Sequence, residues 1–141
     1  MPISDAHVGR TYPATAPYEV SLAKIAEFTA ALGDDNPAYR CPDAIAPPTF
    51  VAVVSATAWE AMFADPELDL ALRRIVHGDQ RFSYTRALRA GDTITAILSI
   101  DKVRVRAGSE IISSSVLVRT TDGEQICTAT STFFHSREVA G

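Results

Sequence analysis

The stretch PTFVAVVSATAW, residues 48–59, is apolar on nearly every side and predicts a helix buried inside the protein. Because proline is tolerated in a first helical turn, this helix should begin near Pro48 or Thr49. Asp65 and Pro66 should end it. The small side chains on the helix would let a β-sheet pack closely against it.

Four strands are expected after this helix, separated by turn-forming residues. They cover about residues 74–86, 93–105, 110–120 and 125–135. A change of parity at Val103 predicts a bulge near Lys102, and Asp122-Gly123 predicts a two-residue hairpin. A buried helix followed by an antiparallel meander predicts an α+β fold in which the sheet wraps around the helix. A helix-on-sheet sandwich of another topology would show a similar pattern.

A second helix is expected upstream, over residues 22–32, with Ser21 as its N-cap and Gly33 as the left-handed residue that ends it. The apolar positions predicted to share one face are Leu22, Ile25, Phe28 and Leu32. An extended segment over residues 12–20 could complete the sheet. The connection 33–48 is long and rich in turn formers, and connections of that length are usually functional or disordered.

The 141 residues fit one domain, with 47% hydrophobic residues and a formal net charge of -4. No run of Lys or Arg forms a basic face, so nucleic acid is not an expected partner. Neither a membrane span nor a signal peptide is apparent, and a cytoplasmic location is expected. Cys41 and Cys127 match no metal spacing and should be reduced thiols; no metal or cofactor is expected. His7 and His135 lie near the ends and should be exposed.

The segment ALGDDNPAY, residues 31–39, is the most informative part of the chain. It resembles the hydratase motif of the MaoC-like hot-dog dehydratases, in which a catalytic histidine ends the motif. Gly33, Asp34 and Asn36-Pro37 match that motif in type and spacing, whereas Tyr39 stands at the position of the histidine.

Three further segments resemble the non-catalytic, N-terminal-type half of this family: IAPPTF at 45–50, IVHGDQRFSY at 75–84 and RAGD at 89–92. The likeness spans about residues 8–134 and is strongest to actinobacterial non-catalytic dehydratase subunits. In such systems one hot-dog subunit carries the catalytic Asp and His, and the other shapes the channel for the acyl chain. The resemblance therefore implies a hot-dog fold and an (R)-3-hydroxyacyl thioester on CoA or acyl carrier protein. It also implies a dimer, with an identical copy or with a second hot-dog chain.

Dehydration of such a thioester requires removal of a C2 proton and protonation of the C3 hydroxyl. A histidine exchanges protons near neutral pH, because its unperturbed pKa is about 6.5, whereas a phenol with a pKa of about 10 is a poor base. Asp34 could accept a proton or orient a water, and free backbone N–H groups near Thr49 could polarise the thioester carbonyl. The catalytic candidates implied by the resemblance are Asp34, Tyr39 and His77, and the substrate-binding candidates are Asn36, Pro48, Thr49, Phe50, Gly78 and Gln80.

Each candidate also has a purely structural interpretation. Asp34 and Asn36-Pro37 are turn formers, and Tyr39 could simply pack. His77 shares strand parity with Asp79, and a structural or interface role is favoured for it over catalysis.

Three functions remain open on these grounds, because a fold does not fix a function. In the first, the chain is a dehydratase subunit that joins a catalytic hot-dog chain edge to edge. Alternatively, it is a homodimeric hydratase or thioesterase that uses Asp34 with Tyr39 or His77, or a non-catalytic protein that binds an acyl thioester. The first is favoured, because Tyr39 leaves the motif without its histidine.

Overall fold

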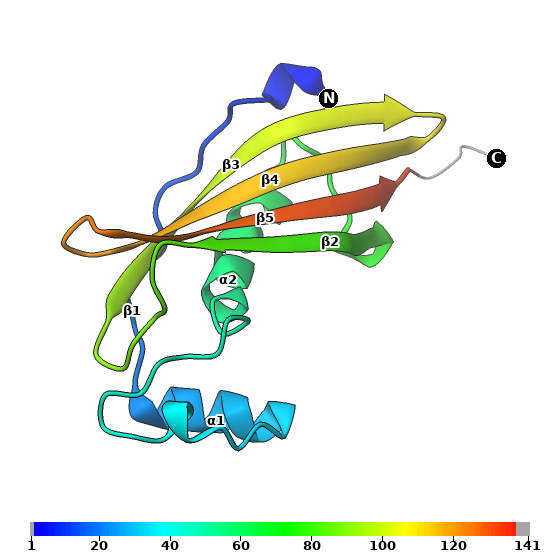
Figure 1. Cartoon of the computed structure of the whole chain (residues 1–141). Coiled ribbons are helices and arrows are strands. Elements are labelled where there is room, and N and C mark those ends of the chain that lie inside the picture. Colours follow the sequence, from blue (N-terminus) through cyan, green and yellow to red (C-terminus); the bar gives the residue numbers. More distant parts are fainter. Residues whose placement is uncertain (1, 138–141) are drawn as a thin grey trace.

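One curled antiparallel sheet forms the body of the protein, in the strand order β1-β3-β4-β5-β2 (Figure 1). The computed structural model describes residues 2–137. The strands are β1 (Tyr18–Glu19), β2 (Ile75–Tyr84), β3 (Thr93–Arg106), β4 (Ser109–Thr120) and β5 (Gln125–Ser136). The helices are α1 (Leu22–Leu32) and α2 (Ala52–Phe63), and the short 3-10 turns are η1 (Asp5–His7), η2 (Pro37–Tyr39) and η3 (Leu72–Arg74). The expected α+β architecture, with the sheet wrapped around the central helix α2, is confirmed (Figure 1).

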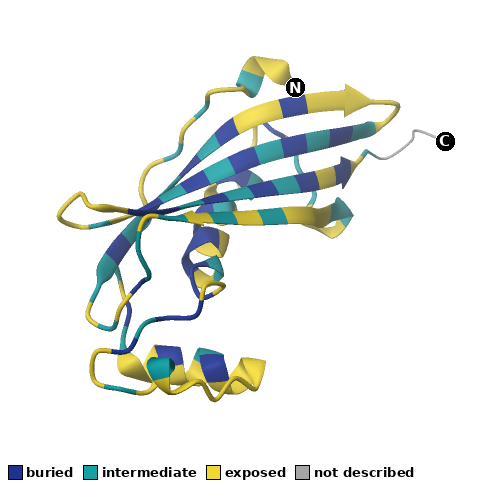
Figure 2. Ribbon diagram, viewed as in Figure 1, coloured by how far each residue is buried: buried dark blue, intermediate teal, exposed yellow. Residues whose placement is uncertain are grey.

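The sheet packs on α2 through an inner face on which every second residue is buried (Figure 2). In the first half of β3 these residues are Ile94, Ala96, Leu98 and Ile100. The expected bulge is confirmed, because the register against β4 shifts between Ile100 and Lys102 and returns Val103 to the inner face. Alternation with period two therefore fixes which face of each strand meets the helix.

Helix α2 differs from the expectation in two respects. It begins at Ala52 rather than near Pro48 or Thr49, because the N–H groups of Phe50, Ala52 and Val53 bond to carbonyls three residues earlier and form a tighter turn. The helix is also not buried on all sides. Its buried residues are Val54, Ser55, Ala58 and Met62, whereas Val53 is 38% exposed. One flank of the central helix therefore has no covering element within residues 2–137.

Helix α1 has the expected bounds and the expected ends, with Ser21 as its N-cap and Gly33 in the left-handed conformation. Its predicted apolar face is wrong in part, because Leu22 and Leu32 are 45% and 54% exposed. The buried positions are Ile25 and Thr29. The reason is that α1 stands off from the sheet, so that only a narrow side of it meets the rest of the chain (Figure 1).

The expected strand over residues 12–20 is shorter than predicted. Only Tyr18–Glu19 pair as β1, although single hydrogen bonds run along β3 from Tyr12 N–H to Leu98 O and from Thr15 N–H to Ala96 O, both at 2.9 Å. Pro13 and Pro17 have no N–H group, so a continuous ladder cannot form across this segment.

The turn between β4 and β5 has three residues instead of the predicted two. The N–H of Gly123 bonds to Thr120 O, the N–H of Thr120 bonds to Glu124 O, and Gly123 has a φ of 96°. This pattern is typical of a turn followed by a left-handed glycine, which is the bulged alternative to the two-residue hairpin.

His135 is buried, so its expected exposure is wrong. It lies on the inner face of β5 opposite Glu110 of β4. Its Nε2 accepts the Ala71 N–H at 3.0 Å, so Nδ1 carries the proton and donates to the Glu110 carboxylate at 3.0 Å. Arg137 donates to the other oxygen of the same carboxylate. Because buried polar groups need partners, this cluster ties the ends of β4 and β5 to the segment before β2.

Candidate functional site

The loop that follows α1 is shaped by hydrogen bonds from its own side chains. The Asp34 carboxylate accepts the Asn36 N–H, and the Asn36 side chain accepts the Ala38 N–H, each at 3.0 Å. The second bond caps η2. Both side chains are exposed, so the structure places the catalytic candidate Asp34 and the binding candidate Asn36 in the turn roles that their residue types favour.

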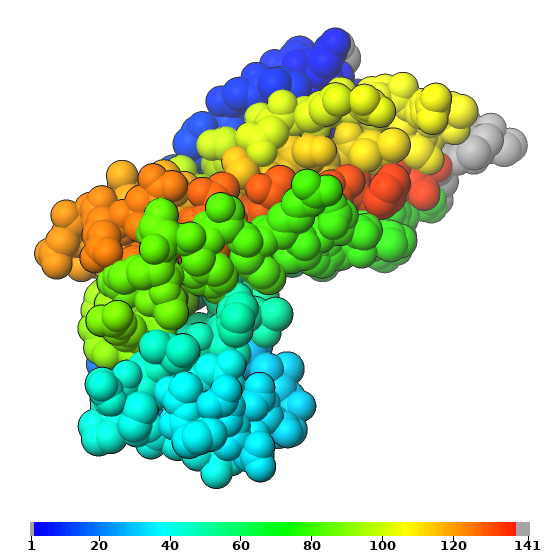
Figure 3. Space-filling view, viewed as in Figure 1, coloured from blue at the N-terminus to red at the C-terminus, as the bar shows by residue number. Residues whose placement is uncertain are grey.

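The half-buried Tyr39, carried by η2, lines two hollows, one that it shares with Tyr84 at the end of β2 and one that it shares with α1. The first has a volume of about 280 Å³ and is named the Tyr39–Tyr84 groove; it is lined by Tyr39, Ile45, Ala46, Pro48, Tyr84 and Ala87. The second has a volume of about 380 Å³ and is lined by Leu22, Ala26, Thr29, Ala30, Tyr39 and Arg40. Figure 3 shows how α1 and the loop after it, in light blue and cyan, stand off from the sheet.

Tyr84 bounds the groove, although the sequence motifs do not single it out. Its hydroxyl donates to the Pro48 carbonyl and so bridges the end of β2 to the start of α2. Burial raises the pKa of Tyr84, with smaller contributions from Cys127, so the hydroxyl stays protonated and can act as a donor. An aromatic side chain with inward parity at the last position of β2 is the signal that could have identified it.

The wall of the groove is held by backbone hydrogen bonds to the connection between β2 and β3. Ala46 N–H donates to Leu88 O at 2.8 Å, and Ala90 N–H donates to Ala44 O at 2.9 Å. The residues that lead into α2 are therefore fixed in an extended conformation, with Leu88 buried behind them. These bonds fix Ala46, one of the aliphatic residues that line the groove.

The candidates on β2 lie in different surroundings from those on the loop. The ring of His77 contacts Trp59 and Phe133, with centroid distances of 5.0 Å and 5.3 Å, and its Nε2 lies 3.1 Å from the Asp79 carbonyl oxygen. A β-bulge at Gly78 shifts the register against β5, so His77 lies on the inner face and Asp79 on the outer face. The expectation that His77 and Asp79 share a face is therefore wrong.

The other predicted ligands on β2 have partners within the chain. A Cβ atom on Gly78 would come within 2.3 Å of the Phe134 ring, so that ring lies directly over the glycine backbone. The Gln80 side-chain oxygen accepts a hydrogen bond from the Ser131 hydroxyl at 2.6 Å.

At the start of α2, Thr49 is exposed, whereas Phe50 is buried and packs on Phe28 with a centroid distance of 5.3 Å. The N–H groups of Phe50 and Ala52 are bonded to carbonyls within the turn. Two of the backbone N–H groups near Thr49 are therefore already used in hydrogen bonds within the turn.

The structure thus divides the candidates into two groups. Tyr39 and Pro48 meet at the groove, whereas His77, Gly78 and Gln80 lie along β2. Because a strand rises about 3.3 Å per residue, His77 is roughly 20 Å from Tyr84 at the groove. Within one chain, His77 and Tyr39 are not brought together.

The groove can hold an apolar group but has no acid–base pair. Among the described residues, its lining consists of two phenols, a proline and aliphatic side chains, without His, Asp or Glu. Residues 2–137 also contain no group of three or more His, Cys, Asp or Glu side chains placed to hold a metal ion. In the same range, no helix has the length and apolar character needed to cross a membrane.

Relatives with known sequences match nearly the whole chain. The family described as "FAS1-like, dehydratase domain region" matches residues 6–129. A UPF0336 protein from Cutibacterium acnes is 50% identical over 137 residues, covering 97% of this chain and 96% of its own. A UPF0336 protein from Streptomyces coelicolor is 44% identical over 138 residues, covering 92% of each chain.

Solved structures show the same fold. The C-terminally truncated HadBC (3R-hydroxyacyl-ACP dehydratase) complex from Mycobacterium tuberculosis has a TM-score of 0.79 at 27% identity, covering 91% of this chain and 96% of that one. A MaoC-like dehydratase has a TM-score of 0.81 at 21% identity, covering 94% of this chain and 43% of that one. An (R)-hydratase from A. caviae has a TM-score of 0.66 at 16% identity, covering 89% and 94%. The last two likenesses concern the hot-dog fold alone.

Proposed function

Because this chain belongs to the FAS1-like dehydratase-region family of MaoC-like hot-dog proteins, we propose that it is the acyl-thioester-binding subunit of an (R)-3-hydroxyacyl dehydratase. The chain binds the acyl tail of a thioester on CoA or acyl carrier protein, and a second hot-dog chain supplies the catalytic Asp and His. One observation carries this proposal: Tyr39, at the position of the family's histidine, forms a wall of an apolar groove without an acid–base pair.

The lining of the groove suits an acyl tail. Ile45, Ala46 and Ala87 offer aliphatic contacts, and the rings of Tyr39 and Tyr84 bound the space. Burial of one methylene group contributes about 0.8 kcal/mol, so several carbons in the groove would anchor a thioester. Tyr39 contributes ring surface rather than a base, because phenols are poor bases near neutral pH.

Strand β2 is the place where a second hot-dog chain would join. It has ten residues and, within the described part of the chain, pairs only with β5. A second antiparallel strand on its open edge would extend the sheet across two chains.

Coexpression with a hot-dog chain that carries the complete Asp and His motif tests this function. The purified pair should hydrate trans-2-enoyl-CoA, whereas this chain alone should not. In the pair, Asp34→Asn in this chain should leave turnover unchanged, because Asp34 accepts a local N–H in the turn. Full turnover by this chain alone, lost on Asp34→Asn, would contradict the subunit role and favour a homodimeric enzyme. Tight acyl-CoA binding without turnover in any mixture would favour a binding protein.

A further inference from the structure

Among the residues that the structure describes, Tyr39 alone lines both of the hollows beside the loop that follows α1. One is the Tyr39–Tyr84 groove, and the other is the hollow of about 380 Å³ beside the helix, which is named the α1 hollow. The two hollows therefore adjoin at this side chain. A ligand that continued from the groove into the α1 hollow would have to pass the Tyr39 ring.

The lining of the α1 hollow suits an apolar chain. Ala26 and Ala30 lie about one turn apart on α1, and their small side chains leave the space open. The Thr29 hydroxyl donates to the Ala26 carbonyl at 3.1 Å and is therefore already bonded. Leu22 is 45% exposed although it is apolar. Arg40 is the only charged side chain of the lining among the described residues, so the hollow presents mainly apolar surface.

The backbone that carries Tyr39 is fixed, whereas its ring is held by packing against the core. The Tyr39 N–H donates to Asn36 O at 3.1 Å, and the Ile45 N–H donates to the carbonyl of the neighbouring Ala38 at 3.2 Å. The Tyr39 hydroxyl has no hydrogen bond to any of residues 2–137, whereas the Tyr84 hydroxyl is bonded. Tyr39 is therefore a wall that the loop positions, and its truncation would break no polar contact of the described chain.

We infer that the Tyr39 ring sets the acyl length that this chain accepts, because it stops the tail of a thioester in the groove and keeps it out of the α1 hollow. The groove, at about 280 Å³, lies just below the usual range of ligand sites, roughly 300–1,000 Å³, so it takes a short tail. The α1 hollow is the larger of the two, so access to it would more than double the space. The inference rests on the proposed binding of an acyl thioester and adds a limit on its length.

Such a limit has a characteristic effect on affinity. Each methylene group that the protein buries should strengthen binding about fourfold. With the ring in place, affinity should rise with acyl length up to a limiting length and stop rising beyond it, because further carbons stay in water. Tyr39 determines the position of this break in the series. A residue with a merely structural role would change the affinity for every length alike and leave the break in place.

Tyr39→Ala tests the inference in a series of saturated acyl-CoA esters from butanoyl to dodecanoyl, measured by isothermal titration calorimetry. The variant should bind the shortest esters more weakly, because the ring no longer contacts them. It should bind an ester two carbons beyond the wild-type limit about tenfold more tightly than the wild type does, since two further methylene groups are then buried. Tyr39→Phe keeps the ring and should keep the wild-type break.

A second substitution tests whether the additional carbons enter the α1 hollow. Ala30 is exposed in the middle of α1, and leucine is also a good helix former, so Ala30→Leu fills part of the hollow at little cost to the helix. In the wild-type background Ala30→Leu should leave the series unchanged, because the tail does not reach the hollow. In the double variant Tyr39→Ala/Ala30→Leu the break should return to the wild-type length.

A break that Tyr39→Ala moves to longer esters and that Ala30→Leu returns would support the inference. An unchanged break, equal weakening at every length, a wild-type series without a break, or a double variant that keeps the longer limit would each overturn it. If Tyr39→Ala does not fold, as judged by circular dichroism, Tyr39→Val takes its place with the same expected result. Absence of binding by every folded protein would overturn the proposed acyl binding and the inference together. Absence of turnover with a catalytic chain would overturn only the dehydratase role.

Discussion

The sheet and the loop that follows α1 are stabilised in different ways. The sheet repeats one arrangement, with buried side chains alternating along β3, β4 and β5. The loop depends on single interactions, such as the caps from Asp34 and Asn36 and the bond from Tyr84 to Pro48. The fold is therefore stabilised by many equivalent contacts, whereas the shape of the groove depends on individual residues.

Truncation of a buried ring in the sheet should have the largest effect. Phe133 is 1% exposed and packs edge-on against Trp59 and Phe63. Phe133→Ala should lower the free energy of unfolding by about 3–5 kcal/mol, because it removes apolar contact and leaves a cavity. The measurement is chemical denaturation.

The next residue in the chain is the matched control for this truncation. Phe134 points to the outer face and is 42% exposed. Phe134→Ala should cost about 1 kcal/mol or less, because surface positions contribute little. Equal losses for the two variants would show that the inner face of β5 does not dominate stability.

Removal of the Glu110 charge should have the second largest effect. Glu110 is 2% exposed and accepts hydrogen bonds from His135 and Arg137. Glu110→Ala would leave both donors without their acceptor and should cost about 3 kcal/mol, measured by denaturation. Glu67→Ala removes an acid that pairs with Arg10 at the exposed surface and should cost less than about 1 kcal/mol.

The sheet was predictable from the sequence because its signals are periodic. The inner positions of β3, the bulge near Lys102 and the bounds of α1 all follow from spacing and caps. The errors arise where tertiary contacts decide. His135 is buried because Glu110 lies opposite it on β4, and no local pattern encodes that pairing.

The groove was predictable only in part. Tyr39 and Pro48, two candidates that the motif comparison names, line one groove, because the loop and the start of α2 adjoin in sequence. Tyr84 comes from the end of β2 and reaches the groove through the curl of the sheet, which spacing cannot reveal. The bulge at Gly78 likewise reversed the parity of Asp79 relative to His77.

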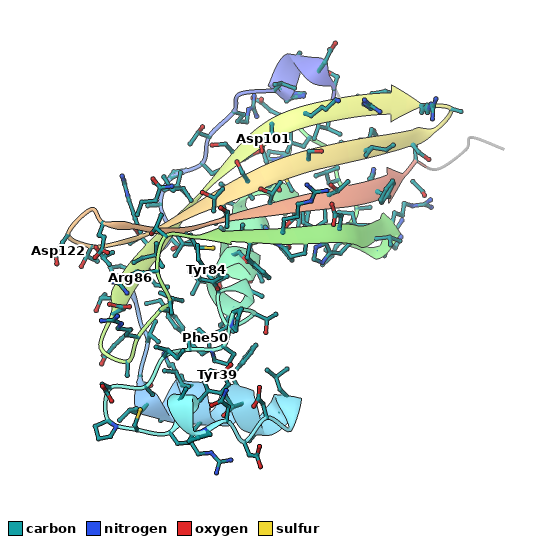
Figure 4. The ribbon with its side chains drawn as sticks, viewed as in Figure 1. Tyr39, Phe50, Tyr84, Arg86, Asp101 and Asp122 are labelled. Carbon is teal, nitrogen blue, oxygen red and sulfur yellow. The ribbon has the colours of Figure 1, made fainter. Side chains whose placement is uncertain are left out.

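The ion pairs of Arg86, in the connection between β2 and β3, should contribute less to stability at acidic pH. Arg86, which is labelled in Figure 4, donates two N–H groups to Asp92 and also pairs with Glu124 of the β4–β5 turn. Burial raises the pKa of Asp92, but the hydrogen bonds from Arg86 and from the Arg89 backbone lower it by more, so the net pKa is below its usual value. A carboxyl with a lowered pKa stabilises the folded state above its unfolded pKa and loses that contribution as pH falls through the folded value.

Asp92→Asn should therefore lower the free energy of unfolding by about 1–2 kcal/mol at pH 7. The difference from the wild type should begin to shrink below about pH 4, the ordinary pKa of an aspartate in the unfolded chain, and should disappear as the pH falls through the lower folded pKa of Asp92. Asp122→Asn, at an exposed position of the β4–β5 turn, should show no difference at either pH. A loss at Asp92 that is independent of pH would mean that packing, rather than charge, gives this residue its role.

Substitutions in the groove should have the smallest effect on the free energy of unfolding, but they should affect ligand binding most. Tyr84→Phe keeps the ring but removes the hydrogen bond to the Pro48 carbonyl, and should cost about 1 kcal/mol or less in unfolding free energy. Because that bond fixes the ring against the start of α2, affinity for a medium-chain acyl-CoA should fall about threefold, as measured by calorimetry. Tyr39→Phe, which removes a hydroxyl with no hydrogen bond to the described residues, should change neither quantity. Equal losses from both variants would assign the binding energy to the two hydroxyls, and the groove would then recognise a polar group instead of an acyl tail.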